Sequence, residues 1–131
     1  MGADLTVGLQ GKNELSVTAE LTAARFGSGL VEVYATPAMI ALMEKTCLES
    51  VTPFLDAGMG TVGTKVEVSH ERATPVGMQV VCESTLTEVD RRRLVFEVLA
   101  SDEVGIIGRG RHERFIIDIK SFTEKTYQQK K

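Results

Sequence analysis

Tryptophan is absent from the 131-residue sequence, and aromatic residues make up only 5% of it. Cysteine occurs twice, as Cys47 and Cys82, and this pair matches no zinc-ligand spacing. Long apolar runs are also missing, since the longest covers residues 38–43 and a bilayer span needs ~20 residues. The first ten residues lack the basic start and apolar stretch of a secretory signal. These absences argue against zinc-binding, membrane-spanning and secreted proteins.

Positive charge is not in excess either, because 18 acidic residues outnumber 15 basic ones and the net charge is −3. A chain of this charge lacks the cationic surface that binds nucleic-acid phosphates. No phosphate-binding Walker loop or serine nucleophile elbow is present. We therefore expect neither nucleic acid nor a membrane among the partners. Both cysteines lie in apolar helix or strand contexts, which favours reduced, buried thiols in a cytoplasmic protein.

The length of the chain allows one domain with its own core and is too short for two ordinary domains. Hydrophobic residues make up 43% of the sequence, as in a globular protein. We predict a single domain over residues 1–131, with flexible ends at residues 1–14 and 124–131.

The hydrophobic periodicity predicts one strand, one long helix and then four strands joined by short turns. Short connections favour an antiparallel sheet, so the fold class is α+β. The predicted helix is apolar on nearly all sides, which indicates that a curved sheet or a partner subunit wraps it. The expected strands are residues 15–21, 61–72, 79–89, 93–100 and 106–119, and the expected helix is residues 37–51, preceded by a mobile loop at 24–31.

Two polar residues break the apolar pattern. Glu44 falls on the helix stripe of Ile40 and Val51, and His70 falls on the strand face of Val66 and Val68. A buried carboxylate needs a partner, and an imidazole can bond to it while keeping one nitrogen free, as a general base requires. The residues alone leave other interpretations open: His70 as a satisfied core residue, and Glu44 turned to water or paired with an arginine.

Thr36 stands before Pro37, where a hydroxyl can cap the first turn of the helix. Met39 occupies the position where a capping box would place Glu or Gln, so the cap is not reinforced. A hydroxyl at a helix start also lies beside free N–H groups and the positive end of the helix dipole, where an oxyanion is stabilised. The spacing alone favours the capping role.

Four segments, YATPAMIALME, GTKVEVSH, ATPVG and GRGRHERFII, follow one another between residues 33 and 123. With these segments the chain resembles the hot-dog fold acyl-CoA thioesterases, most of all the fluoroacetyl-CoA thioesterase-like branch. That branch uses a threonine before the central helix, a glutamate eight residues later and a histidine that ends the next strand. The resemblance therefore implies catalytic roles for Thr36, Glu44 and His70. It also implies substrate-binding roles for Gly63, seven residues before the histidine, and Arg114 in the last strand.

The resemblance implies a curved antiparallel sheet around one long helix and a homodimer that joins edge to edge. It leaves open whether dimers pair into tetramers. The expected function is hydrolysis of a short or small acyl-CoA to a free acid and CoA, with no cofactor besides the CoA of the substrate. One departure concerns residues 27–30, which lack the aromatic lid residue of the fluoroacetyl-specific enzyme and so argue against fluoroacetyl-CoA itself. The alternatives are a non-catalytic acyl-CoA binding or sensing module and, less favoured, a hot-dog hydratase.

Overall fold

The computed structural model describes residues 5–130. Its sheet has the strand order β1-β3-β4-β5-β2, and every neighbouring pair is antiparallel. The strands are β1 (Gln10–Ser16), β2 (Met59–His70), β3 (Gln79–Asp90), β4 (Arg93–Ser101) and β5 (Ile106–Asp118). The helices are α1 (Ala23–Phe26), α2 (Thr36–Val51) and α3 (Ile119–Gln128), with 3₁₀ turns at Ala19–Leu21 and Thr52–Phe54.

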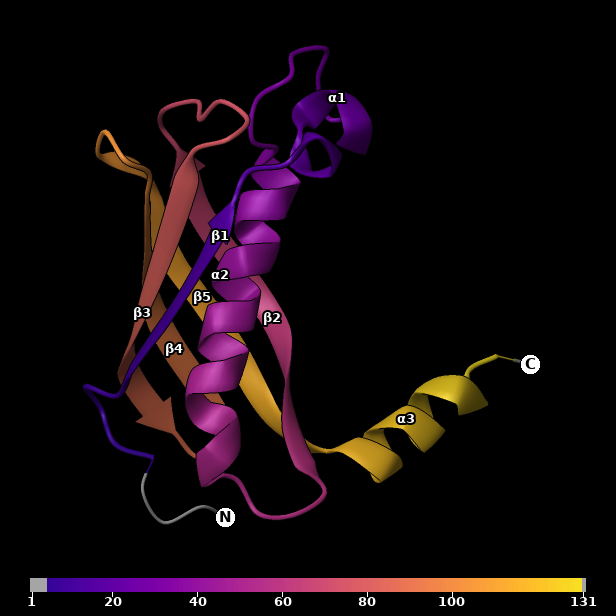
Figure 1. The fold of residues 1–131 in the computed structure, drawn as a ribbon. Coiled ribbons are helices and arrows are strands. Elements are labelled where there is room, and N and C mark those ends of the chain that lie inside the picture. The colour runs from indigo at the N-terminus through magenta and orange to yellow at the C-terminus, as the bar shows by residue number, and fades with distance from the viewer. Residues whose placement is uncertain (1–4, 131) are drawn as a thin grey trace.

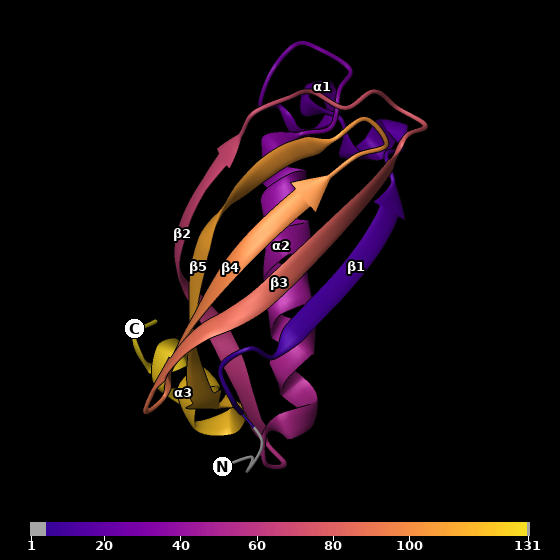
Figure 2. The same cartoon turned by 90° about the vertical axis from the view of Figure 1, so that its left-hand side faces the viewer.

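The sheet curves around α2, which runs along its concave face (Figures 1 and 2). This arrangement confirms the predicted α+β fold with one central helix. Strands β1 and β2 form the two edges, and the short helix α1 lies beyond the N-terminal end of α2. Among the described residues, no helix is long and apolar enough to cross a membrane.

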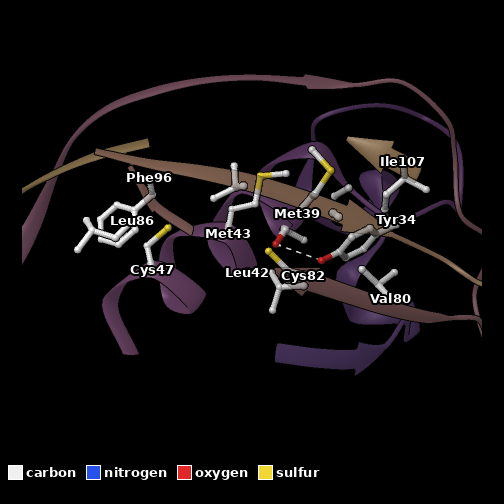
Figure 3. Close-up of a cluster of buried hydrophobic side chains, with 14 of the residues drawn as sticks. Tyr34, Met39, Leu42, Met43, Cys47, Val80, Cys82, Leu86, Phe96 and Ile107 are labelled. Carbon is white, nitrogen blue, oxygen red and sulfur yellow. Dashed lines mark hydrogen bonds between the residues drawn. The ribbon is translucent and has the colours of Figure 1, made fainter. Parts of the chain in front are cut away.

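The core forms between α2 and the inner face of the sheet, as Figure 3 shows for the side chains of both layers. Met39, Met43 and Cys47 of the helix have at most 1% of their surface exposed, and Phe96 of β4 is fully buried. Both cysteines are free and buried, as expected. Burial raises the pKa of the Cys47 thiol to about 12, so this thiol stays protonated.

A β-bulge at Thr64 decides what β2 presents to the helix. Seven residues separate Gly63 from His70, so a regular strand would turn these two positions to opposite faces. The bulge adds one residue to β2 and restores a common face. As a result Gly63 faces Glu44 and His70 faces Thr36, both residues of α2.

The bulge also breaks the uninterrupted alternation that the sequence predicts over residues 61–72. Thr61, expected on the outer face, is buried. Val66 lies beyond the bulge and keeps its expected inner face opposite His112 of β5, although it is 39% exposed because β2 is an edge strand. The first strand was also predicted too late, since β1 spans Gln10–Ser16 and a 3₁₀ turn follows at Ala19–Leu21. The hydrophobic pattern did not predict the bulge at Thr64, because an extra residue in one strand is not visible in the order of polar and apolar residues.

Both ends that the sequence analysis expected to be flexible contain regular secondary structure. Residues 10–14 belong to β1, and residues 124–128 belong to α3, whose N-terminus is capped by the Asp118 carboxylate accepting a bond from the Ser121 N–H. The expected loop at 24–31 also begins within α1. Within the predicted ends, residues 1–4 and 131 lie outside the described residues.

Substitution of Gly11 should destabilise the fold, because a Cβ there would lie 2.7 Å from Ser50 Cβ and 2.9 Å from the Thr46 carbonyl oxygen. We expect Gly11→Ala to lower the free energy of unfolding by about 1–3 kcal/mol through overpacking between β1 and α2. Urea denaturation measures the effect. The control is Gly29→Ala, whose Cβ would meet only Ala23 Cβ at 3.4 Å and should change stability by less than about 0.5 kcal/mol. Equal stability of the two variants would contradict the prediction.

Candidate active site

Thr36 and His70 form a direct hydrogen bond, with 2.7 Å between Thr36 Oγ1 and His70 Nδ1. Thr36 is the first residue of α2, and His70 is the last residue of β2. The N-cap of the helix is Ala35, and no side chain caps the first turn. The capping role that the helix pattern favoured for Thr36 is therefore wrong, and its hydroxyl bonds to a histidine instead.

The other ring nitrogen of His70, Nε2, is buried and has no hydrogen-bond partner among the described residues. Burial lowers the pKa of His70 below its usual value of 6.5, so the ring is neutral at pH 7. A neutral imidazole has one donor and one acceptor nitrogen. If Nε2 carries the proton, Nδ1 accepts from the Thr36 hydroxyl, which is the geometry for removing that proton.

The segment after β2 is fixed beside this pair by the Asp102 carboxylate. That carboxylate accepts bonds from Arg72 Nη2 at 2.6 Å, Thr74 Oγ1 at 2.8 Å and the Val104 and Gly105 N–H groups. Burial by itself raises the pKa of this carboxyl, but these donors outweigh it and hold the value at about 2. Asp102 therefore anchors the loop at 71–78 against the loop at 102–105.

A cavity of about 250 Å³ opens over the Thr36–His70 pair. Tyr34, whose ring stands edge-on to His70 with centroids 6.5 Å apart, forms one wall. Ser28, from the loop after α1, and Arg72 line the cavity as well. The pair therefore faces a space that is open to a ligand.

A second polar group surrounds Gly63 at the bulge. A Cβ built on this glycine would lie 3.1 Å from His112 Cε1, 3.4 Å from Arg114 Nη1 and 3.4 Å from Glu44 Oε2. His112 and Arg114 come from β5, and Glu44 comes from α2. Three charged or ionisable side chains thus converge where this glycine leaves room for them.

Arg114 is a buried cation with several bonds. Its Nε donates to Thr61 Oγ1 at 2.7 Å, and its Nη2 donates to the Thr61 carbonyl at 2.9 Å. Burial lowers the pKa of Arg114, and the charge of Glu44 opposes this shift. Glu44, Gly63 and Arg114, which the sequence analysis named separately, therefore lie together in the structure.

His112 is the residue of this group that the sequence analysis missed. Its side chain is 1% exposed and stacks on Phe96, with ring centroids 6.4 Å apart. The signal was present, because His112 and Arg114 share the inward alternation of Ile116 on β5. The family resemblance implied a role for Arg114 only, so His112, two residues earlier, was not among the predicted site residues.

Glu44 and His70 do not meet within one chain. Glu44 lies eight residues after Thr36, about 12 Å further along the helix. Along β2, Gly63 and His70 are separated by about 23 Å. The expected Glu44–His70 contact is therefore absent here, and the predicted residues form two groups: Thr36 with His70, and Glu44 with Gly63 and Arg114.

The described residues contain no cluster of three His, Cys, Asp or Glu side chains arranged for a metal ion.

The family model described as fluoroacetyl-CoA-specific thioesterase matches residues 17–120. The chain belongs to this thioesterase family. The resemblance found in the four sequence segments is thereby confirmed.

The relatives agree in sequence and in fold. The fluoroacetyl-CoA thioesterase of Streptantibioticus cattleyicolor is 42% identical over 97 residues, which cover 74% of this chain and 70% of the relative. A variant of the fluoroacetyl-CoA-specific thioesterase, crystallised with fluoroacetate and CoA, is 35% identical with a TM-score of 0.86 and covers 90% of this chain and 99% of its own. A thioesterase superfamily member from Thermus thermophilus is 29% identical with a TM-score of 0.90. The match covers 98% of this chain and 95% of the Thermus protein.

The Asp102 anchor yields a pH-dependent prediction. Its folded-state pKa of about 2 lies below the ordinary 3.8, so the stabilisation is complete above about pH 4 and is lost as the pH falls towards 2. Asp102→Asn should therefore lower the free energy of unfolding by about 2 kcal/mol at pH 7 and by much less near pH 2. Urea denaturation across this range measures it. Asp90→Asn, at an exposed position, is the control, and a pH-independent loss for Asp102→Asn would contradict the prediction.

Proposed function

We propose that this protein hydrolyses the thioester of a short or small acyl-CoA to a free acid and CoA. The observation that carries the proposal is the Thr36–His70 hydrogen bond. The second nitrogen of the neutral His70 ring is buried and has no hydrogen-bond partner in the part of the chain that the structure describes. Membership of a thioesterase family and the adjoining cavity support it.

His70 is the general base in this proposal. Its Nδ1 takes the proton of the Thr36 hydroxyl, or of a water in its place, as the oxygen adds to the thioester carbonyl carbon. The carbon–sulfur bond then breaks, and the proton passes from His70 to the departing sulfur to give CoA. On the threonine route, a water molecule subsequently releases the acid from Thr36.

The charge that develops on the carbonyl oxygen also needs donors. The first turn of α2 offers N–H groups without intrahelical partners and the positive end of the helix dipole. Thr36 lies at this turn, so its own hydroxyl and the oxyanion donors are close together. The Gly63 backbone is the alternative source of such donors.

We further propose that a second copy of the chain completes the site. Strand β2 is an edge strand, with backbone groups free to pair with another strand. An antiparallel β2–β2 contact about a two-fold axis between Val66 and Glu67 would bring His70 of one copy opposite Gly63 of the other. Glu44 of the second copy would then approach the unpartnered His70 Nε2 and orient the ring. Direct attack by Glu44 on the thioester remains the other role for this carboxylate.

The C-terminal helix supports the dimer independently. Ile119, Phe122 and Tyr127 lie on one face of α3 and are 51%, 42% and 66% exposed. On the same face, the Thr123 and Thr126 hydroxyls donate to backbone carbonyls of the helix and so present their methyl groups outward. An isolated helix of ten residues is marginal in water, and α3 lies on the β2 side of the sheet (Figures 1 and 2), where the second copy would cover it.

The acyl group proposed here is small but differs from fluoroacetyl. The relatives are named for fluoroacetyl-CoA, whereas residues 27–30 of this chain contain no aromatic side chain. Leu30 is 98% exposed and covers nothing. The proposed chemistry needs no cofactor besides the CoA of the substrate. A cytoplasmic location, where acyl-CoA and reduced thiols occur together, fits it.

Thiol release from a panel of acyl-CoA substrates tests the hydrolase function. His70→Ala and Glu44→Gln should each lower kcat by at least ~10²-fold, because they remove the base and the group that orients it. Glu97→Gln, an exposed carboxylate on the outer face of the sheet, is the matched control and should leave kcat unchanged. Binding of acyl-CoA without release of thiol by the wild type would favour the binding-module alternative.

Subunit mixing tests the shared site. In a heterodimer of Glu44→Gln and His70→Ala chains, one site regains both residues and the other loses both. After exchange of equal amounts of the two inactive homodimers, about a quarter of wild-type activity should return, since half of the dimers are mixed and each carries one intact site. Complete inactivity despite confirmed exchange would show that each site uses residues of one chain.

A further inference from the structure

His112 makes two hydrogen bonds that fix its protonation. Its Nδ1 lies 2.8 Å from the Lys65 carbonyl oxygen, which can only accept, so Nδ1 carries a proton. Its Nε2 lies 3.0 Å from Arg114 Nη1, which can only donate, so Nε2 offers a lone pair. Only the neutral ring with its proton on Nδ1 satisfies both contacts. Burial and the Arg114 charge lower the pKa of His112, which favours the same state.

The Arg114 guanidinium is consequently held at all three of its nitrogens. Thr61 accepts from Nε and Nη2, and His112 accepts from Nη1. Nη1 is also the nitrogen that lies 3.4 Å from the Cβ position of Gly63, where Glu44 Oε2 approaches equally closely. The hydrogen bond to His112 thus fixes Nη1, the end of the guanidinium that lies beside Gly63 together with Glu44.

We propose that His112 is a positioning residue of the thioesterase site, acting as a neutral hydrogen-bond acceptor that orients Arg114 toward Glu44 and Gly63. A neutral acceptor fixes a cation without cancelling its charge, so the full field of Arg114 reaches the Glu44 carboxylate. A carboxylate at position 112 would instead compete with Glu44 for the arginine. The inference rests on the proposed function, in which Glu44 and Arg114 belong to the site.

Two amide substitutions separate this role from simple packing. Gln places its amide oxygen near the position of Nε2 and can still accept from Arg114, whereas Asn places its amide near Nδ1 and keeps only the bond to Lys65. We expect His112→Gln to retain kcat/KM within ~3-fold and His112→Asn to lower it by ~10-fold or more. Equal losses in the two variants, following their thermal stability, would overturn the proposal.

A double-mutant cycle with Arg114→Lys locates the effect. Lys keeps the charge but loses the planar fork that His112 orients. If His112 acts through Arg114, then His112→Asn combined with Arg114→Lys should lose no more kcat/KM than Arg114→Lys alone. Multiplicative losses in the double variant would contradict that route.

Nuclear magnetic resonance supplies a readout that does not depend on turnover. The sequence has two histidines, so a long-range proton–nitrogen spectrum contains two rings, which His70→Ala assigns. We expect a neutral His112 with its proton on Nδ1, and Arg114 Nη1–H signals that persist in His112→Gln and are lost in His112→Asn. A charged ring, or a proton on Nε2, would overturn the inference even in an active enzyme. If the wild type releases no thiol from any acyl-CoA, the hydrolase proposal fails, and these spectra alone decide whether His112 orients Arg114.

Discussion

The burial of α2 within the curved sheet is the constraint on which the other features depend. Met39, Cys47 and Val51 have no exposed surface, so the helix cannot shift or rotate without opening the core. Thr36 and Glu44 project from this fixed helix at a set separation. The bulge in β2 gives its inner face the register that places His70 beside Thr36 and Gly63 beside Glu44.

The buried polar groups are each stabilised electrostatically in a different way. Each group near the helix balances charge in its own way: His70 is neutral, Asp102 is surrounded by donors, and Arg114 shares its environment with Glu44. Within residues 5–130, two buried side-chain atoms have no hydrogen-bond partner, His70 Nε2 and Ser84 Oγ. The unpaired edge of the sheet is on the same strand as His70, so one associating copy would satisfy both the backbone and the ring.

The sequence predicted the last four strands well from their two-residue period, and it predicted the central helix from Pro37 at its start and the apolar run that follows. The α2 bounds differ from the prediction by one residue, at Thr36. Two elements were misjudged: β1 is polar except for Gly11 and Leu15, and α3 has no buried residue. The bulge at Thr64 and the bonds of His112 were beyond prediction, since both depend on register between strands distant in sequence. For Thr36, local helix rules favoured a cap, and only tertiary contact with His70 shows a different partner.

The loop that leads from α1 to α2 stands apart from this tightly packed frame. Its residues 27–31 are all exposed, yet the chain enters the helix at Thr36 only five residues later. The Leu30 side chain is almost fully exposed, whereas a side chain added at Gly108 would collide with Met39. Ser28 of this loop lines the cavity over Thr36 and His70, so one wall of that cavity lies outside the packed core. Substitutions in this loop can therefore reshape the cavity while the helix, the sheet and their polar contacts stay as they are.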